Sequence, residues 1–196
     1  EYLEDVVDRI YIALKNLGDF VNRHYPELRT DLPNEIKYIT SQELEDMYPD
    51  LNPEERENEI AKKERAVFIS KIGGNLKSGK PHDGRAPDYD DWELNGDIIL
   101  WNDILESAYE ISSMGIRVDE ESMKKQLEIS GKKDRENLDF HKKILNRELP
   151  YTVGGGIGQS RLCMYFLRKA HIGEVQVSVW PNEMIKKCEE SDIFLL

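Results

Sequence analysis

A glycine-rich run followed by an arginine is the first feature of this sequence that could perform chemistry. Gly154, Gly156 and Gly158 alternate along the chain, and Arg161 comes three residues after the last of them. Glycines at alternate positions leave one side of an extended backbone bare, so that a flat ring or a phosphate can lie against it. The apolar run that follows predicts a helix from Gln159, which places the arginine beside the positive end of the helix dipole. The segment therefore indicates a nucleotide site, and a purely structural turn remains the alternative.

A second segment has the outline of a phosphate-binding loop without its chemistry. Residues Gly74 to Lys80 fit the spacing G-x-x-x-x-G-K after an apolar stretch. In such a loop the next residue is Ser or Thr, whose hydroxyl binds magnesium, and a helix follows. Here Pro81 takes that position and the residues after it are typical of turns. We therefore do not expect a P-loop.

Two acidic residues further upstream fall on neighbouring predicted strands. Asp97 and Glu110 lie on either side of a short turn, so an antiparallel pairing can bring them together on one sheet surface. Two carboxylates there repel each other unless a divalent cation or a cationic side chain lies between them. Taken alone, Asp97 also fits an ordinary turn aspartate. Glu110 stands in an otherwise apolar strand, where a carboxylate needs a partner.

Other charged residues surround this pair in the sequence. Arg85, Asp90 and Arg117 lie in the same polar segments, and they fit either substrate contacts or ordinary ion pairs. His82 and His171 are isolated, and no group of Cys and His residues has the spacing of a zinc site. The chemistry indicated is therefore that of carboxylates and guanidinium groups around an anionic ligand.

The periodicity of apolar residues predicts the elements that position these groups. Helical spacing from Tyr2 to Tyr25 predicts one long amphipathic helix. The residues from Gly73 to Leu94 form a long loop, which we expect to be either a lid over the site or a disordered segment. Paired strands with helices gathered between them predict an α+β fold with an antiparallel sheet. The other predicted elements are strands over 35–39, 66–72, 96–102, 108–118 and 175–179, and helices over 40–47, 53–64, 120–129, 135–146 and 159–170.

Composition limits the class of protein. A chain of 196 residues with 39% hydrophobic and 34% charged residues suits one globular domain. No apolar run approaches the roughly 20 residues that cross a bilayer, so we expect no membrane partner. The net charge of −12 without a basic stretch disfavours a nucleic-acid partner. Cys163 and Cys188 match no metal spacing, which favours reduced thiols and a cytoplasmic location.

Several separate motifs resemble, in the right order, those of ammonia-dependent asparagine synthetase, the aspartate–ammonia ligase family. The catalytic domain of that family is similar to that of class II aspartyl- and asparaginyl-tRNA synthetases. The matching strings are HDGRAPDYDDW at 82–92, LNGD at 94–97, EISSMGIRVD at 110–119, GGGIGQSR at 154–161 and HIGEVQVSVWP at 171–181. The last of them corresponds to a C-terminal strand of the family.

The resemblance implies a class II synthetase-like fold, an antiparallel sheet flanked by helices. It implies that residues 1–196 form the C-terminal portion of a single catalytic domain, because family members carry a further N-terminal portion. They also have a longer segment before LNGD, where this chain has Glu93 alone after Trp92. The implied reaction uses ATP, Mg²⁺, aspartate and ammonia, proceeds through aspartyl-adenylate, and releases asparagine, AMP and pyrophosphate. A cytoplasmic homodimer is also implied.

The resemblance assigns roles to individual residues. Arg161, Asp90 and Arg85 are implied in catalysis, with Arg161 on the ATP phosphates and Asp90 on the substrate amino group or on ammonia. Asp97 and Glu110 are the implied magnesium ligands. ATP or substrate would be bound by Asp97, Glu110, Ser112, Ser113, Arg117, Gly154, Gly155, Gly156 and Gly158. Two alternatives stay open: an aspartyl- or asparaginyl-tRNA synthetase core, and a non-catalytic module that binds an amino acid or a nucleotide.

Overall fold

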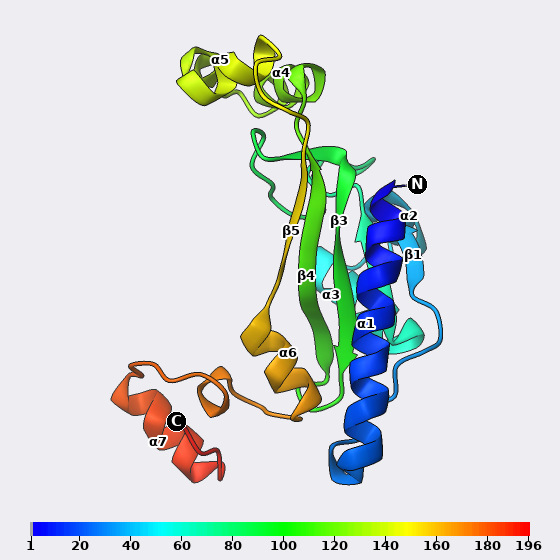
Figure 1. Cartoon of the computed structure of the whole chain (residues 1–196), viewed down its shortest axis with the longest axis vertical. Coiled ribbons are helices and arrows are strands. Elements are labelled where there is room, and N and C mark those ends of the chain that lie inside the picture. The colour runs from blue at the N-terminus through cyan, green and yellow to red at the C-terminus, as the bar shows by residue number, and fades with distance from the viewer. Residues whose placement is uncertain (1) are drawn as a thin grey trace.

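One five-stranded sheet organises the computed structural model, which describes residues 2–196 (Figure 1). The strands follow the order of the sequence, β1-β2-β3-β4-β5. Only β1 and β2 are parallel, and every other neighbouring pair is antiparallel. The expected α+β fold with a mainly antiparallel sheet is confirmed, and the parallel edge arises because two helices carry the chain from β1 back to the start of β2. The strands are β1 Lys37–Thr40, β2 Ala66–Ser70, β3 Asp90–Asn102, β4 Ser107–Arg117 and β5 Val153–Ile157.

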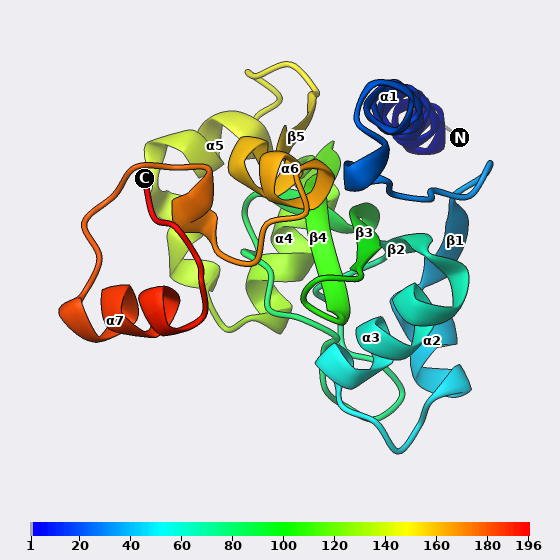
Figure 2. The same ribbon diagram turned by 90° about the horizontal axis from the view of Figure 1, so that it is seen from below.

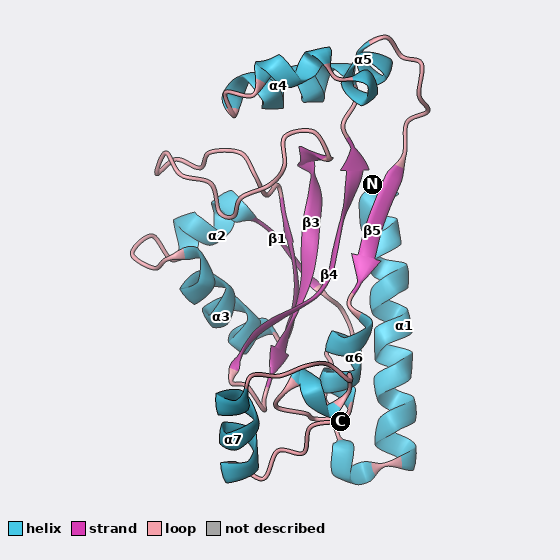
Figure 3. Ribbon diagram, turned by 90° about the vertical axis from the view of Figure 1, so that its left-hand side faces the viewer, coloured by secondary structure: helices cyan, strands magenta, loops and turns pink. Residues whose placement is uncertain are grey.

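Helices cover both faces of the sheet (Figures 2 and 3). On one face, α1 (Tyr2–His24) and α6 (Gln159–Phe166) pack against Phe68, Leu100 and Ile111. On the other, α2 (Ser41–Met47) and α3 (Pro53–Glu64) pack against residues such as Val67 and Ile99. Both faces of β2 are buried, and its first four residues are accordingly all apolar. This continuous apolar run is the pattern that predicted the strand from the sequence.

The boundaries of α2 and α3 follow from their capping residues. Thr40 accepts a hydrogen bond from the backbone N–H of Glu43, whose carboxylate accepts one from the Thr40 N–H in return. Asn52 and Glu55 make the same reciprocal pair at the start of α3. Each pair satisfies two backbone donors that a helix start leaves unpaired. Both predicted helices are confirmed for this reason.

A separate helical unit lies beyond the end of β4 (Figure 1). It consists of α4 (Glu120–Ile129), the 3-10 helix η2 (Lys133–Asn137) and α5 (Asp139–Leu145). The helix predicted over 135–146 is thus interrupted, because Leu138 adopts an extended backbone at φ −74° and ψ 150°. Asp139 then starts a new helix, where its negative charge suits the N-terminal end.

The strand predicted over 175–179 is wrong. This segment lies between the 3-10 helix η3 (Ile172–Glu174) and the helix α7 (Asn182–Glu190), and it pairs with no strand within residues 2–196. Val177 and Val179 are 75% and 95% exposed. Alternating apolar residues predict a half-buried strand, but such a strand forms only beside a partner.

Within the described residues, no helix has the length and apolar character that crossing a membrane requires.

Candidate active site

A pocket of about 450 Å³ lies over β4 and β5, where the glycine-rich run meets the start of α6. Eight of the twelve residues that the sequence nominated line it, and Tyr89 and Ile111 complete the wall. The eight are Asp90, Glu110, Ser113, Arg117, Gly155, Gly156, Gly158 and Arg161. The structure therefore brings together residues from three separate motifs, and the LNGD motif contributes none of them.

An irregularity in β4 places Glu110 and Ser113 on the same face of the sheet. Ser112 pairs with Ile98 and Glu110 pairs with Ile99, so Ile111 is an additional residue in the ladder. In a regular strand, residues three positions apart point to opposite faces, and a bulge restores them to one face. The two residues line the pocket together for this reason.

Ser112 is not in this pocket. Its hydroxyl donates to the Gly156 carbonyl oxygen at 2.9 Å, and its side chain is buried on the face that α1 covers. It borders a different cavity together with Val6, Ile10 and Met114. The expected ligand contact from Ser112 is therefore not supported by its position, because neighbouring residues of a strand alternate between faces.

One end of the pocket is formed by Arg161 and Glu110. Arg161 lies in the first turn of α6, as the sequence predicted. Its Nη1 donates to the Glu110 backbone oxygen at 2.9 Å and lies 3.2 Å from Glu110 Oε1. Both side chains are almost half exposed, at 46% and 43%. The guanidinium and the carboxylate thus remain accessible to a ligand.

The opposite end is formed by Asp90, Arg117 and Tyr89. Arg117 Nη1 pairs with Asp90, and the guanidinium lies 3.9 Å from the centre of the Tyr89 ring. Arg117 Nη2 also donates to the Tyr89 hydroxyl at 3.0 Å. Burial raises the pKa of Asp90, and the hydrogen bond and charge of Arg117 oppose that rise. Sequence reasoning missed Tyr89, although an aromatic ring beside Asp90 was visible in the motif.

Three consecutive glycines of the run, Gly154 to Gly156, have different surroundings. A Cβ at Gly154 would overlap the Arg117 guanidinium, and one at Gly155 would lie 2.6 Å from the Met114 Cβ. At Gly156 a Cβ would meet no atom within 4 Å. The run therefore supports Arg117 at one position, packs against β4 at the next, and leaves the pocket floor bare at the third. Gly154 acts from behind the pocket wall and not as part of its lining.

Arg85 and Asp97 form an ion pair that does not line the pocket. Asp97 lies opposite Ser113 in the ladder, whereas Glu110 lies opposite Ile99, so the two acids do not face each other directly as expected. Burial raises the pKa of Asp97 to about 6, the charge of Arg85 and the Ser113 side chain lower it, and Glu110 raises it further. Asp97 Oδ1 is buried and has no hydrogen-bond partner among residues 2–196.

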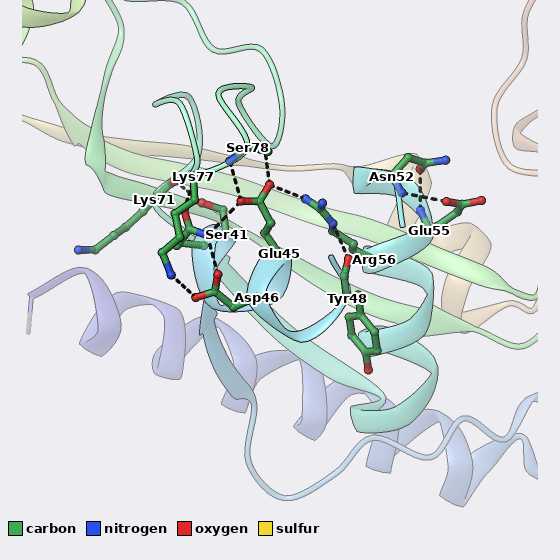
Figure 4. A network of polar contacts seen from close by, with 11 residues as sticks. Ser41, Glu45, Asp46, Tyr48, Asn52, Glu55, Arg56, Lys71, Lys77 and Ser78 are labelled. Atoms are coloured by element: carbon green, nitrogen blue, oxygen red, sulfur yellow. Dashed lines mark hydrogen bonds and ion pairs between the residues drawn. The ribbon is translucent and has the colours of Figure 1, made fainter. Parts of the chain in front are cut away.

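The loop before β3 is packed against the helices, so the disordered alternative is not supported. Ser78 donates to Glu45, which also pairs with Arg56 at 3.2 Å (Figure 4). His82 Nε2 lies 2.8 Å from the carboxylate of Glu57 on α3. The ordered loop holds Arg85 next to Asp97. Its last residues continue into β3, whose bounds include the Trp92–Leu94 link, although the pairing with β4 is irregular there.

Comparison with known proteins decides the family. A profile described as aspartate–ammonia ligase matches residues 1–192. The chain belongs to the aspartate–ammonia ligase family. It is 59% identical over 196 residues to the aspartate–ammonia ligase of Clostridium tetani, covering 100% of this chain and 58% of that protein. It is 60% identical over 195 residues to the enzyme of Lactobacillus acidophilus, covering 99% of this chain and 58% of that protein. The chain thus spans less than two thirds of the length of these two family members.

Solved structures share the fold at low sequence identity. The asparaginyl-tRNA synthetase of Entamoeba histolytica superposes with a TM-score of 0.57 at 18% identity, over 89% of this chain and 43% of that one. The asparaginyl-tRNA synthetase of Pyrococcus horikoshii also gives 0.57, at 14% identity, over 88% of this chain and 44% of that one. The class II synthetase-like fold that the resemblance implied is confirmed.

Proposed function

We propose that the protein containing this chain makes asparagine from aspartate and ammonia, using ATP and passing through aspartyl-adenylate. Membership of the ligase family supports the reaction. The observation that carries the proposal for these residues is a glycine-floored pocket with a different pair of opposite charges at each end. Such a pocket has complementary groups for an amino acid with its own positive and negative charges, and for a polyphosphate.

The Asp90–Arg117 end suits aspartate. A guanidinium forms planar, charge-assisted hydrogen bonds with a carboxylate, and a carboxylate does the same with an ammonium group. Arg117 would bind a substrate carboxylate while Asp90 would bind the amino group or orient ammonia. Tyr89 and Gly154 both lie against Arg117, and Arg117 in turn pairs with Asp90, so little reorganisation is needed on binding.

The Arg161–Glu110 end suits the nucleotide. Arg161 is exposed at the start of α6, and it would offset charge on the phosphates as pyrophosphate departs. Arg85 pairs with Asp97 outside the lining of this pocket, so it would act on the phosphates only after leaving Asp97. Gly156 and Gly158 would lie under the adenosine or the substrate, since a Cβ at Gly156 would meet no atom within 4 Å. Conversion of a carboxylate to a mixed anhydride supplies the leaving group that ammonia then displaces.

Magnesium fits the residues present. No group of three or more His, Cys, Asp or Glu side chains converges within residues 2–196. Mg²⁺ is, however, commonly held by one or two carboxylates together with substrate phosphates and water. Glu110 in the pocket and the unpartnered Oδ1 of Asp97 would hold the ion, which would neutralise phosphate charge. If this is right, Glu110→Gln in the full-length protein raises the Mg²⁺ concentration needed for half-maximal activity; an unaltered requirement contradicts it.

We further infer a cytoplasmic homodimer in which residues 1–196 form the C-terminal part of one catalytic domain. Cys163 and Cys188 form no disulfide, which suits a reducing compartment. Helix α1 buries one side against the sheet but exposes apolar Ile12 and Phe20 on the other. Light scattering of the full-length protein tests the dimer, which predicts a mass twice that of one polypeptide.

One assay tests the reaction. The full-length protein is incubated with aspartate, ATP and ammonium in the absence of tRNA, and asparagine, AMP and pyrophosphate are measured. We expect the three products in equal amounts. The fold shared with asparaginyl-tRNA synthetases makes a tRNA ligase the second candidate. AMP formation that requires tRNA and ignores ammonium would favour that candidate.

A further inference from the structure

The helical unit of α4, η2 and α5 makes side-chain hydrogen bonds to one short segment of the candidate active site. That segment is Pro87–Trp92, which carries both Tyr89 and Asp90. The two parts are about 35 to 50 positions apart in the sequence. The contacts come from only three side chains of the unit, so each can be tested individually.

Gln126 on α4 makes the central contacts. Its side-chain oxygen accepts the Trp92 N–H at 2.8 Å, and its Nε2 donates to the carbonyl oxygens of Pro87 and Asp90, both at 3.0 Å. Gln126 is only 3% exposed. A primary amide offers an acceptor and two donors, and all three are used. The bonds lie on both sides of Tyr89 and Asp90, so the backbone that carries these residues is held before and after them.

The need for such contacts follows from the ladder between β3 and β4. Asp90 pairs with Arg117, but the next paired residues are Asn95 and Gly115, so the register is irregular between them. Trp92 thus lacks a regular partner on β4, and an unpaired buried N–H is costly. Gln126 replaces the missing ladder bond from outside the sheet.

Asp88 provides a second attachment. Its Oδ2 accepts hydrogen bonds from Arg135 Nη1 at 2.7 Å and from His141 Nε2 at 2.9 Å. Arg135 lies on η2 and His141 on α5, so all three elements of the unit contact the segment. Asp88 immediately precedes Tyr89, whose ring lies against Arg117.

We propose that Gln126 and Asp88 are positioning residues, which fix the Asp90–Arg117 pair at the geometry that selects the amino-acid substrate. The proposal rests on the proposed function, in which that pair contacts aspartate. The opposite end of the pocket is held differently, because Arg161 is fixed by α6 and by the Glu110 backbone. Loss of the helical-unit contacts should therefore impair aspartate binding and leave ATP binding nearly intact.

The test is steady-state kinetics of the full-length protein with Gln126→Met, which keeps the side-chain length and removes the three hydrogen bonds. A misplacement of about 1 Å costs up to about 100-fold in rate, so we expect the KM for aspartate to rise about tenfold or more. The KM for ATP should change less than about twofold. Asp88→Asn, which keeps one acceptor oxygen, should give a smaller rise with the same selectivity and extends the test if Gln126→Met does not fold.

The matched control is Arg56→Met. Arg56 is also a buried polar residue on a helix, and it donates to Glu45 and to the Tyr48 carbonyl without contacting the Pro87–Trp92 segment (Figure 4). The Arg56→Met substitution should lower the free energy of unfolding without a selective change in the KM for aspartate. If Arg56→Met and Gln126→Met raise the aspartate KM equally, or if Gln126→Met raises both KM values alike, the positioning role is wrong.

Hydrogen exchange separates this proposal from the proposed function. The Trp92 amide should exchange faster in Gln126→Met, whereas amides in the centre of β2 should not change. Unchanged exchange at Trp92 overturns the positioning role whatever the protein catalyses. If the unaltered protein makes no asparagine while exchange at Trp92 rises as expected, the reaction assignment has failed and the attachment itself stands.

Discussion

Each end of the pocket holds one carboxylate and one guanidinium, but the pair at one end is mostly buried and the pair at the other is almost half exposed. Asp90 and Arg117 are 13% and 22% exposed, and Tyr89 and Gly154 lie against the guanidinium of Arg117. Glu110 and Arg161 are 43% and 46% exposed, although Arg161 also donates to the Glu110 backbone oxygen. A buried pair is costly to break, whereas an exposed pair contributes little to stability and opens easily. The enclosed end is suited to recognising a small substrate. At the open end, the exposed Arg161 side chain can move to stabilise negative charge that develops during the reaction.

The largest expected effect comes from breaking the enclosed pair. Arg117→Ala removes the partner of a buried carboxylate, so the free energy of unfolding should fall by about 3–5 kcal/mol. The same change should raise the KM for aspartate far more than the KM for ATP. Denaturant unfolding and kinetics of the full-length protein measure both effects. A stable Arg117→Ala variant with normal aspartate binding would show that the two ends do not differ in this way.

The open pair should show the converse pattern. Arg161→Ala should leave the free energy of unfolding within about 1 kcal/mol of the original, because exposed ion pairs stabilise weakly. Loss of one preorganised cation at the reacting phosphates should raise the barrier to adenylate formation by about 3–4 kcal/mol. Arg161→Lys should recover only part of the rate, since ammonium lacks the planar fork of the guanidinium. Aspartate-dependent exchange of pyrophosphate into ATP provides the measurement, and normal exchange in Arg161→Ala would refute the role.

Asp97 pairs with Ser113 in the ladder between β3 and β4, and its buried carboxyl group predicts a pH dependence of stability. Its pKa is raised from 3.8 to about 6 by burial, so the folded state takes up a proton below about pH 6 that the unfolded state takes up only near pH 4. The contribution of the Asp97 carboxyl group to the free energy of unfolding is fully present below pH 4, and it is lost as the pH rises to 6. A shift of about two pKa units corresponds to about 3 kcal/mol.

The comparison of Asp97→Asn with the original protein isolates this contribution from those of other carboxyl groups. The unfolding free energy of Asp97→Asn should lack the decrease between pH 4 and 6 that the original protein shows. Denaturant titrations at several pH values measure the difference between the two proteins. A difference that is constant across this range contradicts the assignment.

The sequence predicted those features whose causes are local. Thr40 with Glu43 and Asn52 with Glu55 cap their helices through residues three positions apart, and Arg161 follows directly from the start of α6. The strand over 175–179 was wrong because alternation says nothing about whether a partner strand is available. Local patterns therefore predicted the elements better than their pairing.

The arrangement within the site depended on contacts that no local pattern contains. The extra residue at Ile111 decides that Glu110 and Ser113 share a face and that Ser112 does not. The contacts of Gln126 with Pro87 and Trp92 span more than 30 positions and involve a residue type that is ordinarily exposed. Motifs could nominate the residues of the pocket, but only the register of β4 and the long-range hydrogen bonds could sort them into two ends.

The smallest effects come from single methyl groups placed along the glycine run, and they distinguish the two ends most finely. Gly154→Ala presses on the Arg117 guanidinium, so it should raise the KM for aspartate about tenfold, equivalent to about 1.4 kcal/mol. Gly155→Ala presses on Met114 and should cost about 1–2 kcal/mol of stability. Gly156→Ala meets no protein atom within 4 Å, so its methyl group enters the pocket and should weaken ATP binding without altering stability. Thermal unfolding and the two KM values of each full-length variant measure these effects. If Gly154→Ala and Gly156→Ala impair the same substrate, aspartate and ATP do not occupy separate ends of the pocket.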